Sequence, residues 1–226
     1  MENVNTQGRF SAVLRARRWL APGILEFRLQ RPTGFDFIPG QFVRFVLQEG
    51  YQREYTMISE TDAETLAFCI AVEASGRFSQ AIQAADIEAA FSFDGPLGHF
   101  VFQGPANPAV FVATGTGVAP FVAFFRSGVR GALLLHGVGT ADRLIYRPVL
   151  QAGVQSYVAC ITGENTDGRE DTDLFAGRVT GYLETRLAPG VYDFYLCGRR
   201  AMIRDATAII DLRFEGSRLF IEAYND

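Results

Sequence analysis

The chain has 226 residues, a formal net charge of −4, 48% hydrophobic residues and 20% charged residues. This length can hold one large domain or two small ones, and the composition excludes an intrinsically disordered chain. The negative net charge argues against nucleic-acid binding. No run approaches the roughly 20 apolar residues of a membrane span, and no secretory signal opens the chain, so we expect a cytoplasmic protein.

The cysteines and histidines are few. Cys69, Cys160 and Cys197 are far apart and form no CxxC pair, and the chain has only two histidines. This pattern argues against a disulfide framework and offers no ligand spacing for zinc or an iron–sulfur cluster. We expect no metal site.

The first half, from residue 9 to about 102, alternates short β-rich runs with turns that contain proline and glycine. Such a pattern predicts an antiparallel barrel or sandwich. The expected strands cover residues 9–18, 23–30, 41–48, 53–59, 66–73 and 88–95, with one helix at residues 79–85. We predict an N-terminal antiparallel six-stranded barrel over residues 1–104.

The strand at residues 52–59 carries Arg53, Tyr55 and Thr56, and its alternation places the first two on one face. A guanidinium suits a pyrophosphate, a phenol ring suits a flat heterocycle, and a hydroxyl can hydrogen-bond a ring nitrogen. The stretch is therefore a candidate seat for a flavin dinucleotide. Taken alone, an ordinary edge strand with an exposed arginine is the better interpretation.

A second candidate anion site precedes the expected helix at Gly76, Arg77, Phe78 and Ser79. We expect Ser79 to cap this helix. A plain capped helix explains this segment equally well.

The second half follows a linker at residues 104–108 and alternates apolar strands with helical patterns, which predicts a parallel sheet covered on both faces. Expected strands cover residues 108–114, 131–138, 156–162, 191–198 and 217–224, and helical patterns cover residues 118–128, 141–150, 178–187 and 200–214. We predict a Rossmann-like domain over residues 105–226.

Residues 113–120, ATGTGVAP, join the first strand of this half to a helix. Glycines let the backbone approach a pyrophosphate, the helix N-terminus offers unpaired N–H groups, and Pro120 suits a first helical turn. The third glycine of the GxGxxG fingerprint is absent, so a tight strand-to-helix turn is the alternative.

Two further segments lie where strands end. Cys197 and Gly198 close a parallel strand, the place where such sheets bind ligands, although a lone cysteine there is more often part of the core. Glu222 and Tyr224 in the closing strand would share one face. Residues near a terminus are often frayed, so this pair alone indicates little.

Taken together and in this order, these motifs resemble the ferredoxin–NADP reductase family over nearly the whole chain. The motifs are Arg53-x-Tyr55-Thr56, Gly76 to Ser79, Gly95-Pro96-Leu97-Gly98, Gly115-Thr116-Gly117-Val118-Ala119-Pro120, Cys197-Gly198-x-x-x-Met202 and Ile221-Glu222-Ala223-Tyr224. The resemblance implies an FAD-binding barrel, an NAD(P)-binding domain and hydride transfer between the two cofactors.

The same resemblance implies roles for single residues. Arg53 would hold the FAD pyrophosphate, Tyr55 would stack on the isoalloxazine, and Tyr224 would cover its other face until the nicotinamide displaces it. The implied catalytic residues are Thr56, Cys197, Glu222 and Tyr224. The implied cofactor-binding residues are Arg53, Tyr55, Thr56, Ile70, Val72, Gly76, Arg77, Phe78, Ser79, Thr114, Gly115, Thr116, Gly117, Thr162, Arg178, Cys197, Gly198, Met202 and Tyr224.

The coenzyme expectation is NADP, with NAD possible. Family members often place an arginine after the third strand to grip the 2′-phosphate, whereas this chain has Thr162 and then Gly163. Arg178 matches a second family arginine, and Arg169 lies in the intervening loop.

All basic residues are arginines, and residues 1–53 carry eight of them against four acids. This excess indicates either a solvated strand face or a docking patch for an acidic carrier, ferredoxin or flavodoxin. We expect a monomeric reductase that passes single electrons to such a carrier. The alternatives are an NAD(P)H-flavin reductase or oxygenase reductase component, and a non-catalytic nucleotide-binding subunit.

Overall fold

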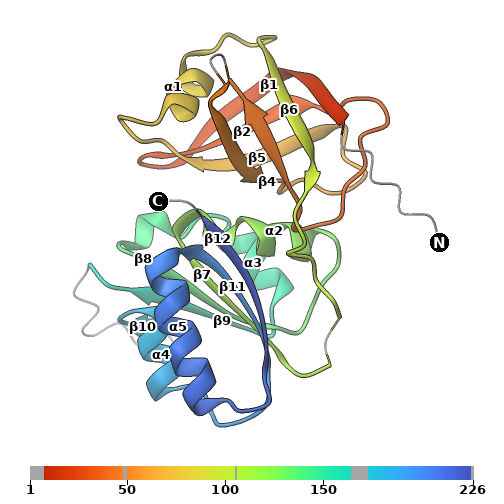
Figure 1. Cartoon of the computed structure of the whole chain (residues 1–226). Coiled ribbons are helices and arrows are strands. Elements are labelled where there is room, and N and C mark those ends of the chain that lie inside the picture. Colours follow the sequence, from red (N-terminus) through yellow and green to blue (C-terminus); the bar gives the residue numbers. More distant parts are fainter. Residues whose placement is uncertain (1–7, 48–49, 105, 164–172, 225–226) are drawn as a thin grey trace, which may run out of the picture. The chain divides into compact units, whose positions relative to one another are not determined.

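The structure is a computed structural model, and it describes the chain except for residues 1–7, 48–49, 105, 164–172 and 225–226. The chain divides into two compact units, Met1–Val101 and Phe102–Asp226 (Figure 1). Among the described helices, none is long and apolar enough to cross a membrane.

The first unit is an antiparallel six-stranded sheet with the order β4-β3-β6-β1-β2-β5. An isolated bridge between Met57 and Phe68, and a 2.8 Å hydrogen bond from the Ile58 N–H to the Ala67 carbonyl, join its two outer strands. The sheet therefore closes into the predicted barrel. Its strands are β1 (Gly8–Ala21), β2 (Ile24–Gln30), β3 (Phe42–Val46), β4 (Gln52–Thr56), β5 (Thr65–Ala71) and β6 (Ala90–Leu97).

Strand alternation explains the barrel core. Leu25, Phe27 and Leu29 of β2 all belong to the buried cluster, and they meet aromatic rings from neighbouring strands. The rings of Phe45 and Phe68, for example, pack edge to face with centroids 5.2 Å apart, a favoured geometry for aromatic pairs. The fold of this unit therefore depends on a phenylalanine-rich interior.

The one helix of this unit, α1 (Arg77–Ala84), begins two residues before the predicted start. Phe78 and Ile82 enter the barrel core, and Arg17 donates to the Ile82 carbonyl at 3.1 Å. The expectation that Ser79 caps the helix is wrong: Gly76 is the N-cap residue, and Ser79 lies inside the first turn. Its hydroxyl turns back and donates to the Gly76 carbonyl at 2.9 Å, so it cannot cap a helix from outside.

The second unit is a six-stranded sheet with the order β10-β9-β8-β7-β11-β12, and all its pairs are parallel. This confirms the predicted Rossmann-like architecture. The strands are β7 (Ala109–Thr114), β8 (Leu133–Val138), β9 (Ser156–Ile161), β10 (Leu174–Ala176), β11 (Asp193–Arg199) and β12 (Arg218–Tyr224). The helices are α2 (Ala119–Arg126), α3 (Arg147–Gly153), α4 (Val179–Thr185) and α5 (Arg200–Arg213).

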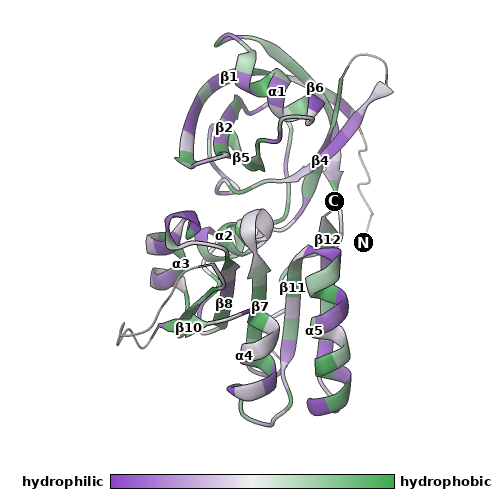
Figure 2. Ribbon diagram, turned by 90° about the vertical axis from the view of Figure 1, so that its left-hand side faces the viewer, coloured by the Kyte–Doolittle hydropathy of each residue, from purple (hydrophilic) through white to green (hydrophobic). Residues whose placement is uncertain are grey.

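Helices cover both faces of this sheet. Residues of α4 and α5 share a buried cluster with Val110 and Val112 of β7, whereas Phe111, which points the other way, stacks on Phe121 of α2 at 4.9 Å. Hydrophilic and hydrophobic residues alternate along α5, as expected for a helix with one face on the sheet (Figure 2). The inner strands β7, β8, β9 and β11 are mostly buried, whereas the edge strands β10 and β12 are partly exposed.

Two local expectations of this half were wrong. The helical pattern at residues 141–150 is split into a 3-10 turn at Ala141–Arg143 and α3, with Tyr146 between them at a left-handed φ of 58°. Pro148 explains the break, because proline is accepted in a first helical turn but not in a helix interior. The short parallel strand β10 was expected to be loop, since three residues are too few to show a period.

Candidate functional site

In the barrel, one face of β4 presents a row of side chains. Arg53 is paired with Phe45 and Tyr55 with Val43 across β3, and both of these partners lie in the core. Arg53 and Tyr55 therefore lie on the same, inward face of β4, as the alternation predicts. The opposite face carries Glu54, which accepts hydrogen bonds from Arg44 at 3.0 and 2.7 Å.

Tyr55 offers a half-buried aromatic ring at this place. The ring lies between Phe78 and Phe45, with centroids 5.0 and 6.1 Å away. Burial raises the pKa of its hydroxyl well above the usual value, so the phenol is neutral at physiological pH. The residue fits the role of a platform for a flat heterocycle.

The remaining barrel residues of the predicted set are less open. Thr56 is 4% exposed, and Ile70 and Phe78 are each 1% exposed within the core. Val72, just after β5, packs partly against the same cluster. For Ile70 and Phe78, only the backbone is left for a cofactor contact.

The N-terminus of α1 forms a tight turn beside this face. A Cβ at Gly76 would lie 2.4 Å from the Ser79 hydroxyl, so a larger residue at position 76 would displace that hydroxyl. That hydroxyl also accepts a hydrogen bond from the Glu73 N–H at 3.4 Å. Arg77, the first helical residue, is exposed. The turn thus combines a cation with the N–H groups of a helix start.

In the second unit, the carboxyl ends of β7 and β11 are adjacent, at the point where the strand order reverses. Such a switch point is where open α/β sheets bind ligands. Thr114 ends β7, Gly115 has a φ of 55°, and a 3-10 turn at Gly115–Val118 leads into α2. Pro120 is in the first turn of α2, as predicted.

Two glycines let these strand ends touch. A Cβ at Gly117 would lie 2.4 Å from the Cys197 carbonyl oxygen, and one at Gly198 would lie 2.1 Å from the Thr114 hydroxyl. That hydroxyl also accepts a hydrogen bond from the Arg199 N–H at 3.3 Å. We call Thr114–Gly117 together with Cys197–Gly198 the glycine junction; at Gly115, Gly117 and Gly198 its backbone carries no side chain.

The closing strand brings three predicted residues together. Cys197 is paired with Glu222, and Tyr224 with Arg199, between β11 and β12. Glu222 and Tyr224 are half-buried on one face, while Ile221 and Ala223, which alternate with them, are exposed. Burial raises the pKa of the Cys197 thiol well above its usual value, although a hydrogen bond from Tyr224 opposes this. Met202 lies over Gly198 in the first turn of α5.

The two residues expected at the coenzyme 2′-position are exposed and near one another. Thr162 follows β9, and Arg178 follows Gly177, whose N–H donates to the Ile161 carbonyl at 2.8 Å. Arg169 lies outside the described residues. Of the two arginines that the sequence suggested for this place, Arg178 is the one that the structure describes.

The sequence interpretation missed Tyr51. Its ring lies 4.2 Å from the Arg53 guanidinium carbon and 5.6 Å from that of Arg77. The signal was present in the sequence, because Tyr51 is two residues before Arg53 and so falls on the same face of the strand.

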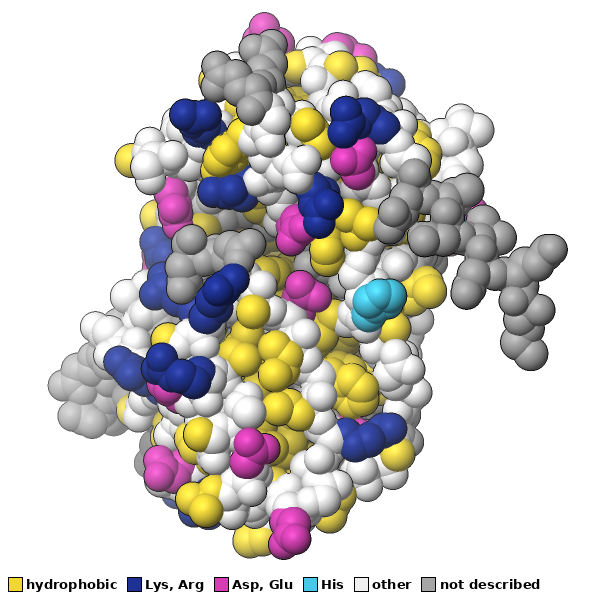
Figure 3. All heavy atoms as spheres, viewed as in Figure 1, with side chains coloured by type: hydrophobic (Ala, Val, Ile, Leu, Met, Phe, Trp, Pro, Cys, Tyr) yellow, Lys and Arg dark blue, Asp and Glu magenta, His cyan; other side chains and the backbone are white. Residues whose placement is uncertain are grey.

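Most arginines of the first 53 residues are ion-paired, so the positive excess there is locally neutralised. Six of the eight contact an acidic side chain: Arg9 with Asp94, Arg15 with Glu88, Arg18 and Arg28 with Glu26, Arg31 with Asp36, and Arg44 with Glu54. Figure 3 shows basic and acidic side chains intermingled over the barrel.

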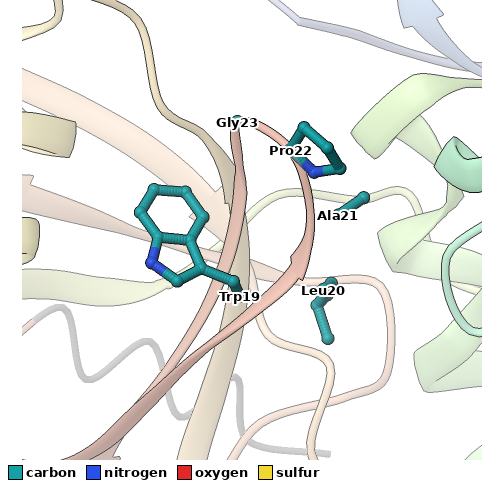
Figure 4. Close-up of a pocket in the computed structure, with 5 residues that line it drawn as sticks. All are labelled: Trp19, Leu20, Ala21, Pro22 and Gly23. Carbon is teal, nitrogen blue, oxygen red and sulfur yellow. The ribbon is translucent and has the colours of Figure 1, made fainter.

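A surface hollow of about 450 Å³ lies at the β1–β2 turn and is lined by residues 19–23 (Figure 4). Trp19, 52% exposed, is its largest side chain, and none of the five lining residues is charged. The hollow offers no group for chemistry and is not part of the candidate site.

Comparisons with known proteins agree with both units. The oxidoreductase FAD-binding domain family matches residues 22–102, and the oxidoreductase NAD-binding domain family matches residues 111–208. A solved ferredoxin NADP+ reductase from Neisseria gonorrhoeae, with bound FAD and NADP, superposes with a TM-score of 0.79 at 21% identity, covering 95% of this chain and 98% of that one.

Two curated relatives match this chain over only part of their own length. The 2-halobenzoate 1,2-dioxygenase electron transfer component of Burkholderia cepacia is 27% identical over 74% of this chain and 52% of its own length. Ferredoxin–NADP reductase B of Sorangium cellulosum is 33% identical over 63% of this chain and 64% of its own length. The chain thus spans about half to two thirds of these relatives. With its FAD-binding barrel and NAD-binding Rossmann-like unit, the chain belongs to the ferredoxin–NADP reductase family of oxidoreductases.

Proposed function

We propose that this protein is an FAD-dependent oxidoreductase that takes a hydride from NAD(P)H and delivers single electrons to an external carrier, ferredoxin or flavodoxin. The observation that carries the proposal is the pairing, in one chain, of the Arg53–Tyr55 face of β4 with the glycine junction. The first suits a flavin dinucleotide, and the second suits a nicotinamide dinucleotide.

The barrel residues would bind FAD as follows. Arg53, Arg77 and the N–H groups at the start of α1 would hold the pyrophosphate. Tyr55 would support the ring system, and the Thr56 hydroxyl would hydrogen-bond its polar edge. Bound FAD supplies the chemistry of accepting a hydride and releasing electrons one at a time.

The second unit would hold and orient NAD(P)H. The backbone of Thr114–Gly117 would receive the pyrophosphate, and Cys197, Glu222 and Tyr224 would surround the nicotinamide. Because burial keeps the Cys197 thiol protonated, it would act by excluding water and shaping the site rather than as a base. The contribution of these residues is therefore positioning.

The coenzyme proposal is NADPH, with Arg178 as the 2′-phosphate contact. Its support is the exposed position of Arg178 beside the end of β9. NADH is the alternative, because Gly163 stands where many family members have arginine.

The carrier would dock on the arginine-rich half of the barrel. Since six of its arginines are already ion-paired, we expect only a modest fall in ferredoxin turnover as salt rises. A role as an oxygenase reductase component or flavin reductase is the second candidate, and the resemblance to the 2-halobenzoate dioxygenase component favours it. Turnover with ferredoxin, flavodoxin and free FMN, each at low and high salt, separates these functions.

The decisive experiment is an anaerobic NADPH titration of the purified protein, followed by visible absorption. A flavin band that bleaches stoichiometrically is the expected result. A band that bleaches only with NADH would keep the reductase function and reverse the coenzyme proposal. A protein that takes up no FAD would overturn the proposed function.

A further inference from the structure

Two arginines from different elements meet over one tyrosine ring in the barrel. The Arg53 guanidinium carbon, from β4, is 4.2 Å from the centroid of the Tyr51 ring, and that of Arg77, from the start of α1, is 5.6 Å away. The two guanidinium groups therefore lie within about 10 Å of each other. Both arginines are exposed, so the charges face solvent.

Tyr51 is a fixed platform for these cations. Its carbonyl accepts a 2.8 Å hydrogen bond from the Leu47 N–H, which extends the β3–β4 pairing by one step. Its side chain is half-buried and packs against the barrel core. Arginine side chains lose considerable rotamer freedom when they are ordered, and stacking on a held aromatic ring reduces that loss on binding.

The charge balance of this place favours an anionic ligand. Glu54 faces the other side of β4, where it is engaged by Arg44, and Glu73 is the acid whose charge reaches Tyr55 on the inner side. Two guanidinium groups beside one ring can each engage one phosphate of a dinucleotide bridge, whereas a single phosphate can engage only part of the pair.

We propose that Tyr51 is a positioning residue that holds Arg53 and Arg77 as a two-arginine clamp for the pyrophosphate of FAD, and so makes the barrel prefer FAD over FMN. The inference rests on the proposed function, since it concerns the same flavin site. It adds a residue that contacts no ligand atom itself and assigns it the selection between two flavins.

The test is a set of flavin dissociation constants, measured by fluorescence quenching on the full chain. We expect Tyr51→Leu to weaken FAD binding about tenfold and FMN binding less than about twofold, because the lost cation–π contacts act through the pyrophosphate. Tyr51→Phe keeps the ring and would stay within about twofold of the natural protein for FAD. In an Arg53→Gln/Arg77→Gln background, Tyr51→Leu would have no further effect.

Equal weakening of FAD and FMN by Tyr51→Leu, or the same weakening with and without the two arginines, would assign Tyr51 a purely structural role and overturn the clamp. Tyr51→Met, which keeps an apolar side chain of similar length, supplies the same comparison if the leucine variant does not fold. A natural protein that binds neither flavin would instead overturn the proposed function itself. The two failures are thus distinguishable before any variant is made.

Discussion

The two units build their candidate sites in opposite ways. In the barrel, the site is made of side chains: Arg53 and Tyr55 lie on one face of β4, Tyr51 directly precedes this strand, and the start of α1 brings Arg77 beside Tyr51. In the Rossmann-like unit, the site depends on the absence of side chains, because Gly117 and Gly198 let the ends of β7 and β11 touch. The barrel site should therefore weaken by degrees when it is mutated, whereas the glycine junction should fail when one methyl group is added.

The sharpest test of this contrast is Gly117→Ala. The added Cβ would meet the Cys197 carbonyl oxygen at 2.4 Å and the Gly198 Cα at 2.7 Å, both of them backbone atoms that cannot rotate away. We expect a loss of more than about 3 kcal/mol from the stability of the second unit, and no reduction by NADPH, while FAD binding is retained. Urea unfolding and the anaerobic titration measure these effects.

Gly139→Ala is the matched control, because a Cβ there would meet nothing within 4 Å. It lies in the same unit, just after β8, and should change neither stability nor reduction. A Gly117→Ala protein that NADPH still bleaches normally would show that the strand ends can separate without loss of function.

The second prediction concerns His136, which is fully buried in β8 with its Nδ1 atom 2.9 Å from the Tyr157 hydroxyl. Burial lowers its pKa from 6.5 to about 4. Between these pH values His136 is protonated in the unfolded chain but stays neutral in the folded chain. The free energy of unfolding should therefore fall by up to about 3 kcal/mol as pH drops from 6.5 to 4.

His136→Gln should flatten this part of the pH–stability curve, measured by urea unfolding at several pH values. His99→Gln, at an exposed barrel position, is the control and should leave the slope unchanged. Parallel curves for the natural protein and His136→Gln would contradict the assignment of the titration to this histidine.

The third prediction concerns Asp193, where we expect a smaller change in stability. This residue begins β11, at the end of the strand opposite the glycine junction. Its buried carboxylate accepts hydrogen bonds from Arg218 at 2.8 and 2.6 Å and from the Asn107 side chain at 2.9 Å. Arg218 is the main cause of a pKa held well below 3.8, so the stabilisation is present above about pH 4 and is lost as pH falls further.

Asp193→Asn should cost about 2 kcal/mol at pH 7, since charge-assisted hydrogen bonds to a buried group are lost while Arg218 stays partly solvated. The cost should shrink in acid, which thermal unfolding at pH 7 and pH 3 would detect. Asp205→Asn is the control. It removes only an exposed ion pair with Arg204, so it should hardly change the stability at either pH. An equal cost at both pH values would argue against the ionised form as the stabilising one.

Arg178→Leu tests the coenzyme proposal and has the smallest effect on the fold. We expect the KM for NADPH to rise about tenfold with the KM for NADH unchanged, because only NADPH carries the 2′-phosphate. Arg186→Leu, at the other end of α4, is the control for a lost surface charge. Steady-state kinetics with both coenzymes decides, and an equal rise for NADH would rule out a 2′-phosphate contact.

Local sequence patterns were sufficient to predict much of the fold and part of the candidate site. Strand alternation predicted that Arg53 and Tyr55 share a face, and the apolar strands between helices predicted the parallel sheet. The same rules failed where the signal was short or mixed, at β10, at the Ser79 cap and at the helix that Pro148 interrupts. In each case a few residues carried too little periodicity to outweigh turn chemistry or packing.

The order and type of most elements, and the motifs that mark the family, could be read from the residues alone, because these depend on periods of two and 3.6 residues and on the geometry of glycine and proline. Which segments meet became clear only from the folded chain. The contact of Gly117 with Cys197, the approach of Arg77 to Tyr51 and the ion pair of Arg9 with Asp94 all join distant residues. They follow from strand order and barrel closure, which are set by burial of the whole apolar surface rather than by any local pattern.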